Sequence, residues 1–263
     1  MIMITQKQIF TANSFVGEGC SGNPAGVCLL PHAYPEEFYQ ATAISVGAAE
    51  TAFVYRDKDR LVLKWYTRNG TEVAACGHAT LAAAYILWKN HLLERSQAIE
   101  FSTRSGLITA TCDDEYITLD FPADTVTAEK PPRYDFKMLL GIEPTYIGKT
   151  KYDYFVVTQK DEDVFNLHPD FSDLMQVEAR GIIVTSTSGS PKYDYVNRFF
   201  APRLGINEDP VTGSAHVSLG MYWSRVLNKS NLVGYQASSE RGLIKVTVLK
   251  DRVLISGKVS ESG

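Results

Sequence analysis

Two segments of the chain, Glu72–Ala79 and Glu208–Ala215, hold the residue types best suited to chemistry and repeat one pattern. Glutamate, glycine and alanine occupy the same places in both copies. A thiol and an imidazole flank the glycine of the first copy, and a carboxylate and a hydroxyl accompany that of the second. Buried polar groups are costly unless they are paired or used, so the clusters indicate a site. Cys76 and His78 flank Gly77, and the residues that are costly beside a buried helix are His78, Asp209, Ser214 and His216. We interpret His216, one turn into its predicted helix, as structural.

Each copy runs into a stretch with almost no charge. We predict helices over 78–90 and 214–227, and a helix that is apolar on all sides must be buried. The first turn of a helix carries unpaired N–H groups and about half a positive charge, which suits an anion near Gly77 or Gly213. A glycine before an alanine-rich helix often reflects close packing alone, and the second copy is what favours a site. Two such helices with facing N-termini would form one site between two related halves.

The composition excludes several classes of protein. The 263 residues are 44% hydrophobic and 21% charged, which gives an ordinary globular chain with room for two compact domains. A net charge of −4 offers no basic surface for nucleic acid. The longest apolar runs are too short to cross a bilayer, and the N-terminus lacks the basic start and apolar core of a signal peptide. We therefore expect no nucleic acid partner, no membrane association and a cytoplasmic location.

No motif for a metal or cofactor is found. The four cysteines, at positions 20, 28, 76 and 112, show no CxxC spacing, and we interpret them as reduced thiols without a zinc framework. The chain has no phosphate loop of the GxxxxGK type and no cluster with metal-ligand spacing. Gly17–Gly22 is rich in glycine but lacks the GxGxxG order of a dinucleotide site. We expect neither a metal nor a cofactor.

Strands outnumber helices in the predicted order of elements. Runs of β-branched and aromatic residues predict strands around each buried helix, and Pro35–Val46 is typical of an amphipathic helix ended by Gly47. The segment Pro122–Pro132 contains three prolines and no apolar period, which indicates a domain boundary. We predict an N-terminal domain over 1–124 and a C-terminal domain over 125–263. A mostly antiparallel sheet curled around its own helix would explain why each helix lacks a polar face.

Four ordered motifs resemble those of the phenazine-biosynthesis-like isomerases, the PhzF-type proteins. They are Gly22–Val27, Glu50–Phe53, Cys76–Thr80 and Glu208–Ala215. The resemblance covers nearly the whole chain and implies the diaminopimelate-epimerase-like fold. This α+β fold has two pseudo-symmetric domains, each a β-barrel-like, mostly antiparallel sheet around a central buried helix, with the active site between them. The resemblance also implies a homodimer and a small carboxylate-bearing substrate.

The resemblance implies that Glu50 is the acid/base residue. An independent physical argument is that Glu50 is the lone carboxylate in an apolar stretch, where partial desolvation would raise its pKa toward the range useful for proton transfer. A glutamate at a strand start can equally lie in water. His78 and Asp209 are expected to assist by orienting the substrate and sharing the proton.

Four residues are predicted to bind the substrate. The N–H groups near Gly77 and Gly213 can hold a carboxylate or an enolate-like charge. Ser214 can bond a carboxylate or cap its helix. Asn23 belongs to the first of the family's motifs. Family members often have proline where Arg68 stands, so this cation bears on the identity of the substrate.

Cys76 leaves three interpretations open. In related epimerases and racemases a cysteine at this place is one of two opposed thiol bases, but the second place here is Thr212, whose hydroxyl has no useful acidity. A one-cysteine dehydratase is a further alternative, and the third is a small buried residue that packs beside the helix.

Taken with the family resemblance, the sequence predicts a cofactor-independent isomerase that moves a proton or a double bond. The alternatives are a Cys76-dependent epimerase or dehydratase, or a non-catalytic protein that binds a small acid.

Overall fold

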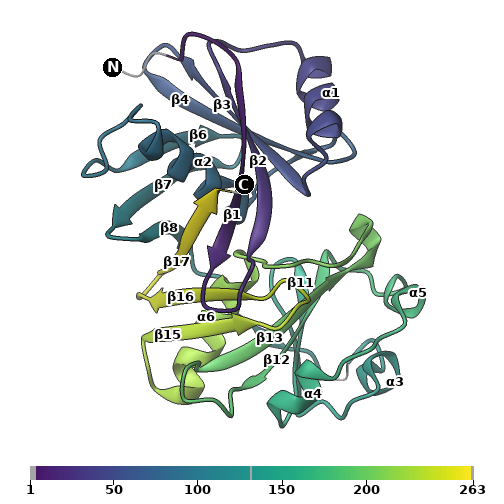
Figure 1. Ribbon diagram of the computed structural model, residues 1–263. Helices are drawn as coiled ribbons and strands as arrows, with labels where there is room; N and C mark the ends of the chain where they lie inside the picture. Colours follow the sequence, from purple (N-terminus) through teal and green to yellow (C-terminus); the bar gives the residue numbers. More distant parts are fainter. Residues whose placement is uncertain (1–3, 131, 262–263) are drawn as a thin grey trace. The chain divides into compact units, whose positions relative to one another are not determined.

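The computed structural model describes residues 4–130 and 132–261 (Figure 1). The chain divides into two compact units. Unit 1 runs to Phe121 and takes in the chain again from Ser256, and unit 2 is Pro122–Ile255. The predicted C-terminal domain over 125–263 therefore needs correction at its end. The last strand returns to pair with the first strand of unit 1, and no local sequence signal announces such a long-range pairing.

The sheet of unit 1 closes on itself. Its second and third strands run parallel, as do its fourth and sixth, and the other neighbours are antiparallel. The last strand pairs with both the first and the eighth, which completes the ring. These strands are β1 (Gln8–Val16), β2 (Asn23–Leu30), β3 (Glu50–Asp57), β4 (Arg60–Thr67), β6 (Ile99–Thr103), β7 (Gly106–Asp113), β8 (Tyr116–Pro122) and β17 (Arg252–Glu261), with β5 (Glu72–Val73) beside β4.

Two helices pack on this sheet. Helix α2 (Gly77–Lys89) is buried along nearly its whole length and contacts β1, β2 and β3, as its uncharged sequence predicts. Helix α1 (Glu36–Val46) packs on β3 and β4, and Gly47 ends it with a φ of 71°. Alternate residues of the strands face α1, and the resulting core cluster is Cys28, Leu30, Tyr39, Ala43, Phe53, Tyr55 and Tyr66.

Unit 2 repeats the strand pairing of unit 1. Its strands β11 and β12 are parallel, as are β13 and β15, and the other pairs are antiparallel. The duplication predicted from two short motifs is therefore also a duplication of topology. The strands are β9 (Thr127–Ala128), β10 (Tyr146–Lys149), β11 (Asp153–Val157), β12 (Gly181–Thr187), β13 (Tyr195–Ala201), β14 (Ile206–Glu208), β15 (Asn231–Gln236) and β16 (Gly242–Val248).

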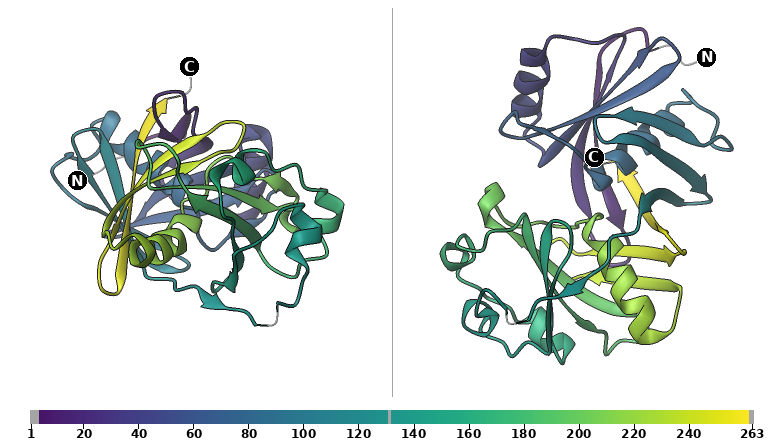
Figure 2. Two further views of the ribbon diagram at one scale, coloured as in Figure 1. Left: turned by 90° about the horizontal axis from the view of Figure 1, so that it is seen from below. Right: turned by 180° about the vertical axis from the view of Figure 1, so that it is seen from behind.

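The helix of unit 2 that corresponds to α2 is α6 (Ala215–Leu227), which packs along β15 and β16 (Figure 2). The helix comes so close to the sheet that a Cβ at Gly220 would lie 2.5 Å from a methyl group of Val246. Unit 2 also has a single-turn helix, α5 (Phe171–Leu174). The short helices α3 (Phe136–Leu140) and α4 (Asp161–Phe165) were not predicted, because single turns carry no periodic signal.

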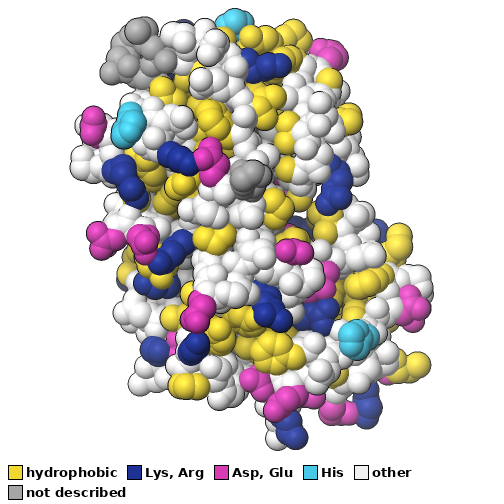
Figure 3. Space-filling model, in the orientation of Figure 1, with side chains coloured by type: hydrophobic (Ala, Val, Ile, Leu, Met, Phe, Trp, Pro, Cys, Tyr) yellow, Lys and Arg dark blue, Asp and Glu magenta, His cyan; other side chains and the backbone are white. Residues whose placement is uncertain are grey.

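The fold is mixed α+β, with mostly strands and few helices. Within the described residues, no helix is long and apolar enough to cross a membrane. Basic and acidic side chains are interspersed on the face drawn in Figure 3, without a continuous basic area.

Candidate active site

In unit 1 the fold brings Glu50 and His78 together. Glu50 is the first residue of β3, opposite Ala25 of β2, and His78 lies in the first turn of α2. Because α2 packs on these strands, Oε2 of Glu50 comes to 3.3 Å from Nε2 of His78. The side chains are 14% and 7% exposed respectively. Glu50 is thus neither free in water nor fully buried, and it can reach both His78 and a ligand.

Cys76 completes this cluster. Its Sγ lies 3.5 Å from Nδ1 and 3.9 Å from Nε2 of His78. The residue precedes α2 in an extended conformation, and its carbonyl accepts a 2.6 Å hydrogen bond from the Thr80 hydroxyl. Burial raises the pKa of the Cys76 thiol, and the Glu50 charge adds to this rise, while His78 opposes it. The thiol therefore stays protonated at neutral pH and is a poor base.

His78 is biased toward its protonated form. Burial alone lowers the pKa of His78, but its interactions with Cys76 and with the Glu50 carboxylate raise it, and the pKa lies well above its ordinary value. An imidazolium beside a carboxylate supplies one acid and one base. The Ser14 hydroxyl of β1 donates to the His78 carbonyl at 2.7 Å and so ties this turn of α2 to the sheet.

The same three residues are of types that can hold a metal. Donor atoms of Glu50, Cys76 and His78 all lie within 4.8 Å of one another, and zinc accepts carboxylate, thiolate and imidazole ligands. The expectation of no metal rested on spacing in the sequence, which cannot reveal that β3 approaches α2. In the structure the donor atoms contact one another directly.

Asn23 and Gly77 lie next to this cluster. Asn23 is fully buried and pairs across the β1–β2 ladder with Ser14, the residue that bonds the His78 carbonyl. Gly77 is the first residue of α2, which has no side-chain cap and no acidic residue in its first turn. The start of this helix is therefore suited to an anion.

In unit 2 the second motif forms a tightly bonded loop. The Thr212 hydroxyl donates to Oδ2 of Asp209 at 2.6 Å. The fully buried Gln236 accepts from the Thr212 N–H at 2.9 Å and donates to the Asp209 carbonyl at 2.8 Å. Thr212 stands where Cys76 stands in the first motif, and here it orients a carboxylate. Sequence patterns did not indicate Gln236, which lies in β15, a strand that was not predicted.

Ser214 makes no capping hydrogen bond to α6. Its Oγ instead accepts a 3.0 Å hydrogen bond from Nη1 of Arg180. Capping was one of the two alternatives for this residue, and the structure has a different contact. Gly213, immediately before it, is buried. Arg180 was also missed, because a lone arginine before a strand carries no pattern.

The two repeated glutamates pair with cations on the preceding strand. Glu72 lies 3.6 Å from Nζ of Lys64 on β4. Glu208 binds both the Nε and the Nη2 of Arg198 on β13 at 2.7 Å. Each salt bridge ties the approach to its motif to the sheet, so the glutamate that both copies share is structural.

Arg68, the departure from the family's pattern, has an exposed side chain. Its N–H donates to the carbonyl of Ala49 at 3.1 Å, which places the Arg68 backbone beside the residue before Glu50.

His216 in α6 is fully buried, and its Nδ1 lies 2.8 Å from the Tyr195 hydroxyl. Burial lowers the pKa of His216 to about 3, so this histidine is neutral and structural, as its place one turn into the helix predicts.

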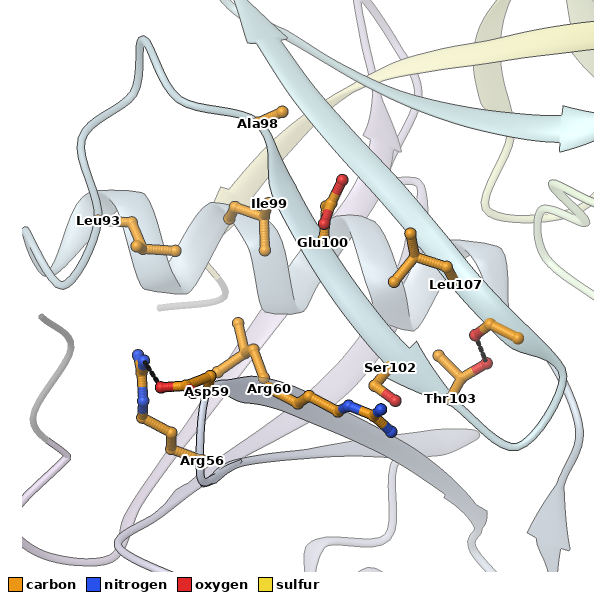
Figure 4. A pocket seen from close by; sticks show the side chains of 12 residues that line it. Arg56, Asp59, Arg60, Leu93, Ala98, Ile99, Glu100, Ser102, Thr103 and Leu107 are labelled. Carbon is orange, nitrogen blue, oxygen red and sulfur yellow. Dashed lines mark hydrogen bonds and ion pairs between the residues drawn. The ribbon is translucent and has the colours of Figure 1, made fainter.

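Two surface hollows are formed by other residues. One of about 510 Å³ in unit 1 is lined by Arg56, Arg60 and Glu100, among others (Figure 4). Another of about 520 Å³ in unit 2 is lined by segment 132–137 and by Glu143, Pro144 and Ile147. Neither lining includes a predicted site residue, so these hollows do not support the assignment. That the cluster of unit 1 and the loop of unit 2 act on one substrate stays a prediction.

Comparisons with known proteins agree with the motifs. The family model described as phenazine biosynthesis-like protein matches residues 10–261. A protein of Halalkalibacterium halodurans named an uncharacterized isomerase is 42% identical over 250 residues, which cover 95% of this chain and 94% of that protein. The crystal structure of a PhzF-family protein of Enterococcus faecalis superposes with a TM-score of 0.91 at 34% identity, covering 98% of both chains.

A more distant structure shares the fold alone. A hydroxyproline epimerase of Agrobacterium vitis superposes with a TM-score of 0.62 at 10% identity, covering 100% of this chain and 92% of that one. The likeness in fold thus extends to epimerases, whereas the likeness in sequence is with PhzF-type proteins. The chain therefore belongs to the phenazine biosynthesis-like family, whose members include homologues named isomerases.

Proposed function

We propose that the protein is a cofactor-independent isomerase that moves a proton, or shifts a double bond, in a small carboxylate-bearing substrate. The observation that carries this proposal is the contact between Glu50 and His78 at the start of a buried helix. The family's isomerases support the reaction class. The diaminopimelate-epimerase-like arrangement of two pseudo-symmetric halves is part of the same proposal.

Glu50 is the base in this mechanism. Its carboxylate removes a proton from a carbon next to a carbonyl group or a double bond, so that a C–H bond breaks and an O–H bond forms. The electron pair left on carbon spreads into the neighbouring π system. A proton then returns at another carbon, either from Glu50 or from the protonated His78, and in the second case Glu50 passes its proton to His78 across their 3.3 Å contact. Acid and base are thus restored, and no electron is gained or lost.

Helix N-termini are suited to hold the charge of the substrate. The N–H groups at Gly77 and Gly213 would stabilise a carboxylate or the enolate-like intermediate, with Asn23 and Ser214 as further contacts. Asp209, oriented by Thr212, would accept a hydrogen bond from the substrate or share the proton. We propose that both halves act on one substrate molecule, and that the protein works in the cytoplasm as a homodimer.

The alternatives differ in which residue does the work. A Cys76-dependent epimerase or dehydratase needs a thiolate, whereas burial raises the pKa of this thiol. A protein that only binds a small acid would keep the anion contacts and need no base. Exchange of substrate hydrogen with solvent needs a base even when no product accumulates. Measuring this exchange therefore separates an enzyme from a protein that only binds the acid.

The test is exchange of substrate hydrogen with solvent. The protein is incubated in D₂O with a panel of small carboxylic acids that carry a C–H next to a carbonyl group or a double bond, and loss of the ¹H NMR signal is followed. We expect exchange or isomerisation of at least one acid, abolished by Glu50→Gln and unchanged by Glu100→Gln, a matched change on the exposed face of β6. Binding without exchange would favour the binding protein, and exchange that survives in Glu50→Gln would overturn the proposal.

A further inference from the structure

Arg180 lies in unit 2 one residue before the place that corresponds to Glu50 in unit 1. Strands β3 and β12 correspond, because each pairs in parallel with the strand before it and antiparallel with the strand after it. Glu50 begins β3, and Arg180 directly precedes β12. His78 and Ser214 share one position of the repeated motif. The 3.3 Å contact of Glu50 with His78 thus has its counterpart in the 3.0 Å hydrogen bond of Arg180 to Ser214.

The guanidinium of Arg180 is held rigidly. Asp153, only 3% exposed, accepts from Nε at 2.8 Å and also from Nη2. The rings of Tyr152 and Phe199 lie 5.4 and 5.5 Å from its Cζ, and cations over aromatic rings gain further attraction. A side chain fixed on three sides, yet 31% exposed, has a defined direction toward Ser214.

This geometry determines the role of the Ser214 hydroxyl. A guanidinium can only donate hydrogen bonds, so Oγ of Ser214 must be the acceptor from Arg180. The hydroxyl hydrogen then points away from the cation, and the oxygen is not also engaged as a helix cap, because Ser214 makes no cap. A hydroxyl that accepts from a charged donor is itself a stronger donor.

We infer that Arg180 is a positioning residue that sets Ser214 as the hydrogen-bond donor to the carboxylate of the substrate. The paired Asp153 balances the charge of Arg180, so the arginine acts through the hydroxyl. Unit 1 thus presents a carboxylate base at its helix, and unit 2 presents an oriented donor at the equivalent helix. This inference rests on the proposed function for the role of Ser214, while its test is independent of Glu50.

The experiment measures the preference for a carboxylate over its amide. Crotonate and crotonamide are titrated into the full-length protein, and the Gly213 and Ser214 amide signals are followed by ¹⁵N NMR. In the wild-type protein we expect tighter binding of crotonate. Arg180→Gln and Ser214→Ala should each reduce that preference by about tenfold, the size expected for a charge-assisted hydrogen bond. Arg180→Lys, which keeps a charged donor, should restore part of it.

A double-mutant cycle decides whether Arg180 acts through Ser214. If it does, adding Arg180→Gln to Ser214→Ala brings no further loss. Losses that multiply, or a wild-type protein with no preference for crotonate, would overturn the inference. Arg180→Gln leaves the buried Asp153 without its partner, which could reduce binding through misfolding. The double variant Asp153→Asn/Arg180→Gln removes this unpaired charge, and we expect its preference for crotonate to stay reduced.

The control variant is Lys229→Gln, which removes a similar ion pair, with Asp194 at 2.6 Å, just beyond the opposite end of α6. A helix of 13 residues is about 20 Å long, and we expect this variant to bind crotonate like the wild-type protein. Failure of the proposed isomerase would appear as unchanged exchange in Glu50→Gln. Failure of the Arg180 inference would appear in the binding cycle alone.

Discussion

Glu50 on β3 and His78 on α2 face each other across 3.3 Å, and this contact joins the strand that carries the proposed base to the helix that suits an anion. His78 is held at its backbone by Ser14 and at its ring by Cys76 and Glu50. A base that is positioned before the substrate arrives does not lose orientational freedom during the reaction. The predictions below begin with this pair.

Replacing Glu50 with glutamine should lower the rate of solvent exchange by about 10²–10⁴-fold, the usual contribution of general acid–base catalysis. The amide keeps the size of the side chain and can still contact His78, but it cannot take a proton at neutral pH. The rate is measured by ¹H NMR in D₂O on the acid found in the exchange screen. A glutamine variant with a nearly normal rate would remove Glu50 from the mechanism.

Cys76→Ala should leave the exchange rate nearly unchanged, because a thiol with a raised pKa is mostly protonated at neutral pH and does not act as a base. Alkylation of Cys76 by iodoacetamide at pH 7.5 should accordingly be slower than that of free N-acetylcysteine, since the thiolate is the nucleophile. Mass spectrometry of the Cys76 peptide gives the rate. A folded but inactive Cys76→Ala protein would favour the thiol epimerase or dehydratase instead.

The isomerase should work without a metal, even though Glu50, Cys76 and His78 form a set of donors that a metal could bind. We expect the exchange rate to be the same before and after dialysis against EDTA, and the purified protein to carry no stoichiometric zinc by elemental analysis. Added zinc should slow exchange, because it would occupy the base. Activity that disappears with EDTA and returns with zinc would show that the metal takes part.

Much of the fold could be predicted because its signals are local. The uncharged stretches predicted α2 and α6, and the β-branched and aromatic runs predicted strands around each of these helices. The repeat of one motif predicted two related units, and the strand pairing agrees. The return of β17 to unit 1 was not predictable, because its pairing with β1 joins the two ends of the chain.

The candidate site was predictable only where its residues lie in motifs. Glu50, His78 and Asp209 were found in this way, but Arg180 and Gln236 were not, although each contacts the second motif directly. Both are single polar residues beside strands and become visible only through the hydrogen bonds that the fold creates. A buried glutamine must satisfy its amide, so an isolated glutamine in an apolar strand such as β15 is the one signal that the sequence offered.

The protein should lose stability in mild acid because of His216. Burial lowers the pKa of this histidine to about 3 in the folded state, while in the unfolded chain it is near 6.5. Below pH 6.5 the unfolded state therefore binds a proton that the folded state does not, and the free energy of unfolding falls as the pH falls. The limiting slope is about 1.4 kcal/mol per pH unit. His78, with its raised pKa, stays protonated in the folded state while its unfolded-state imidazole titrates near pH 6.5, so it contributes an opposite slope around pH 7 that fades as the pH falls below 6.5.

Urea unfolding between pH 6 and 5 measures this dependence, in a range below the unfolded-state pKa of histidine and above the usual pKa of carboxyl groups. We expect His216→Asn to flatten the slope, whatever its effect on stability at pH 7, because asparagine does not titrate. The matched control is His32→Asn, which removes an exposed histidine of unit 1 and should keep the wild-type slope. If His216→Asn keeps the full acid dependence, the loss of stability belongs to other groups and His216 is not buried in its neutral form.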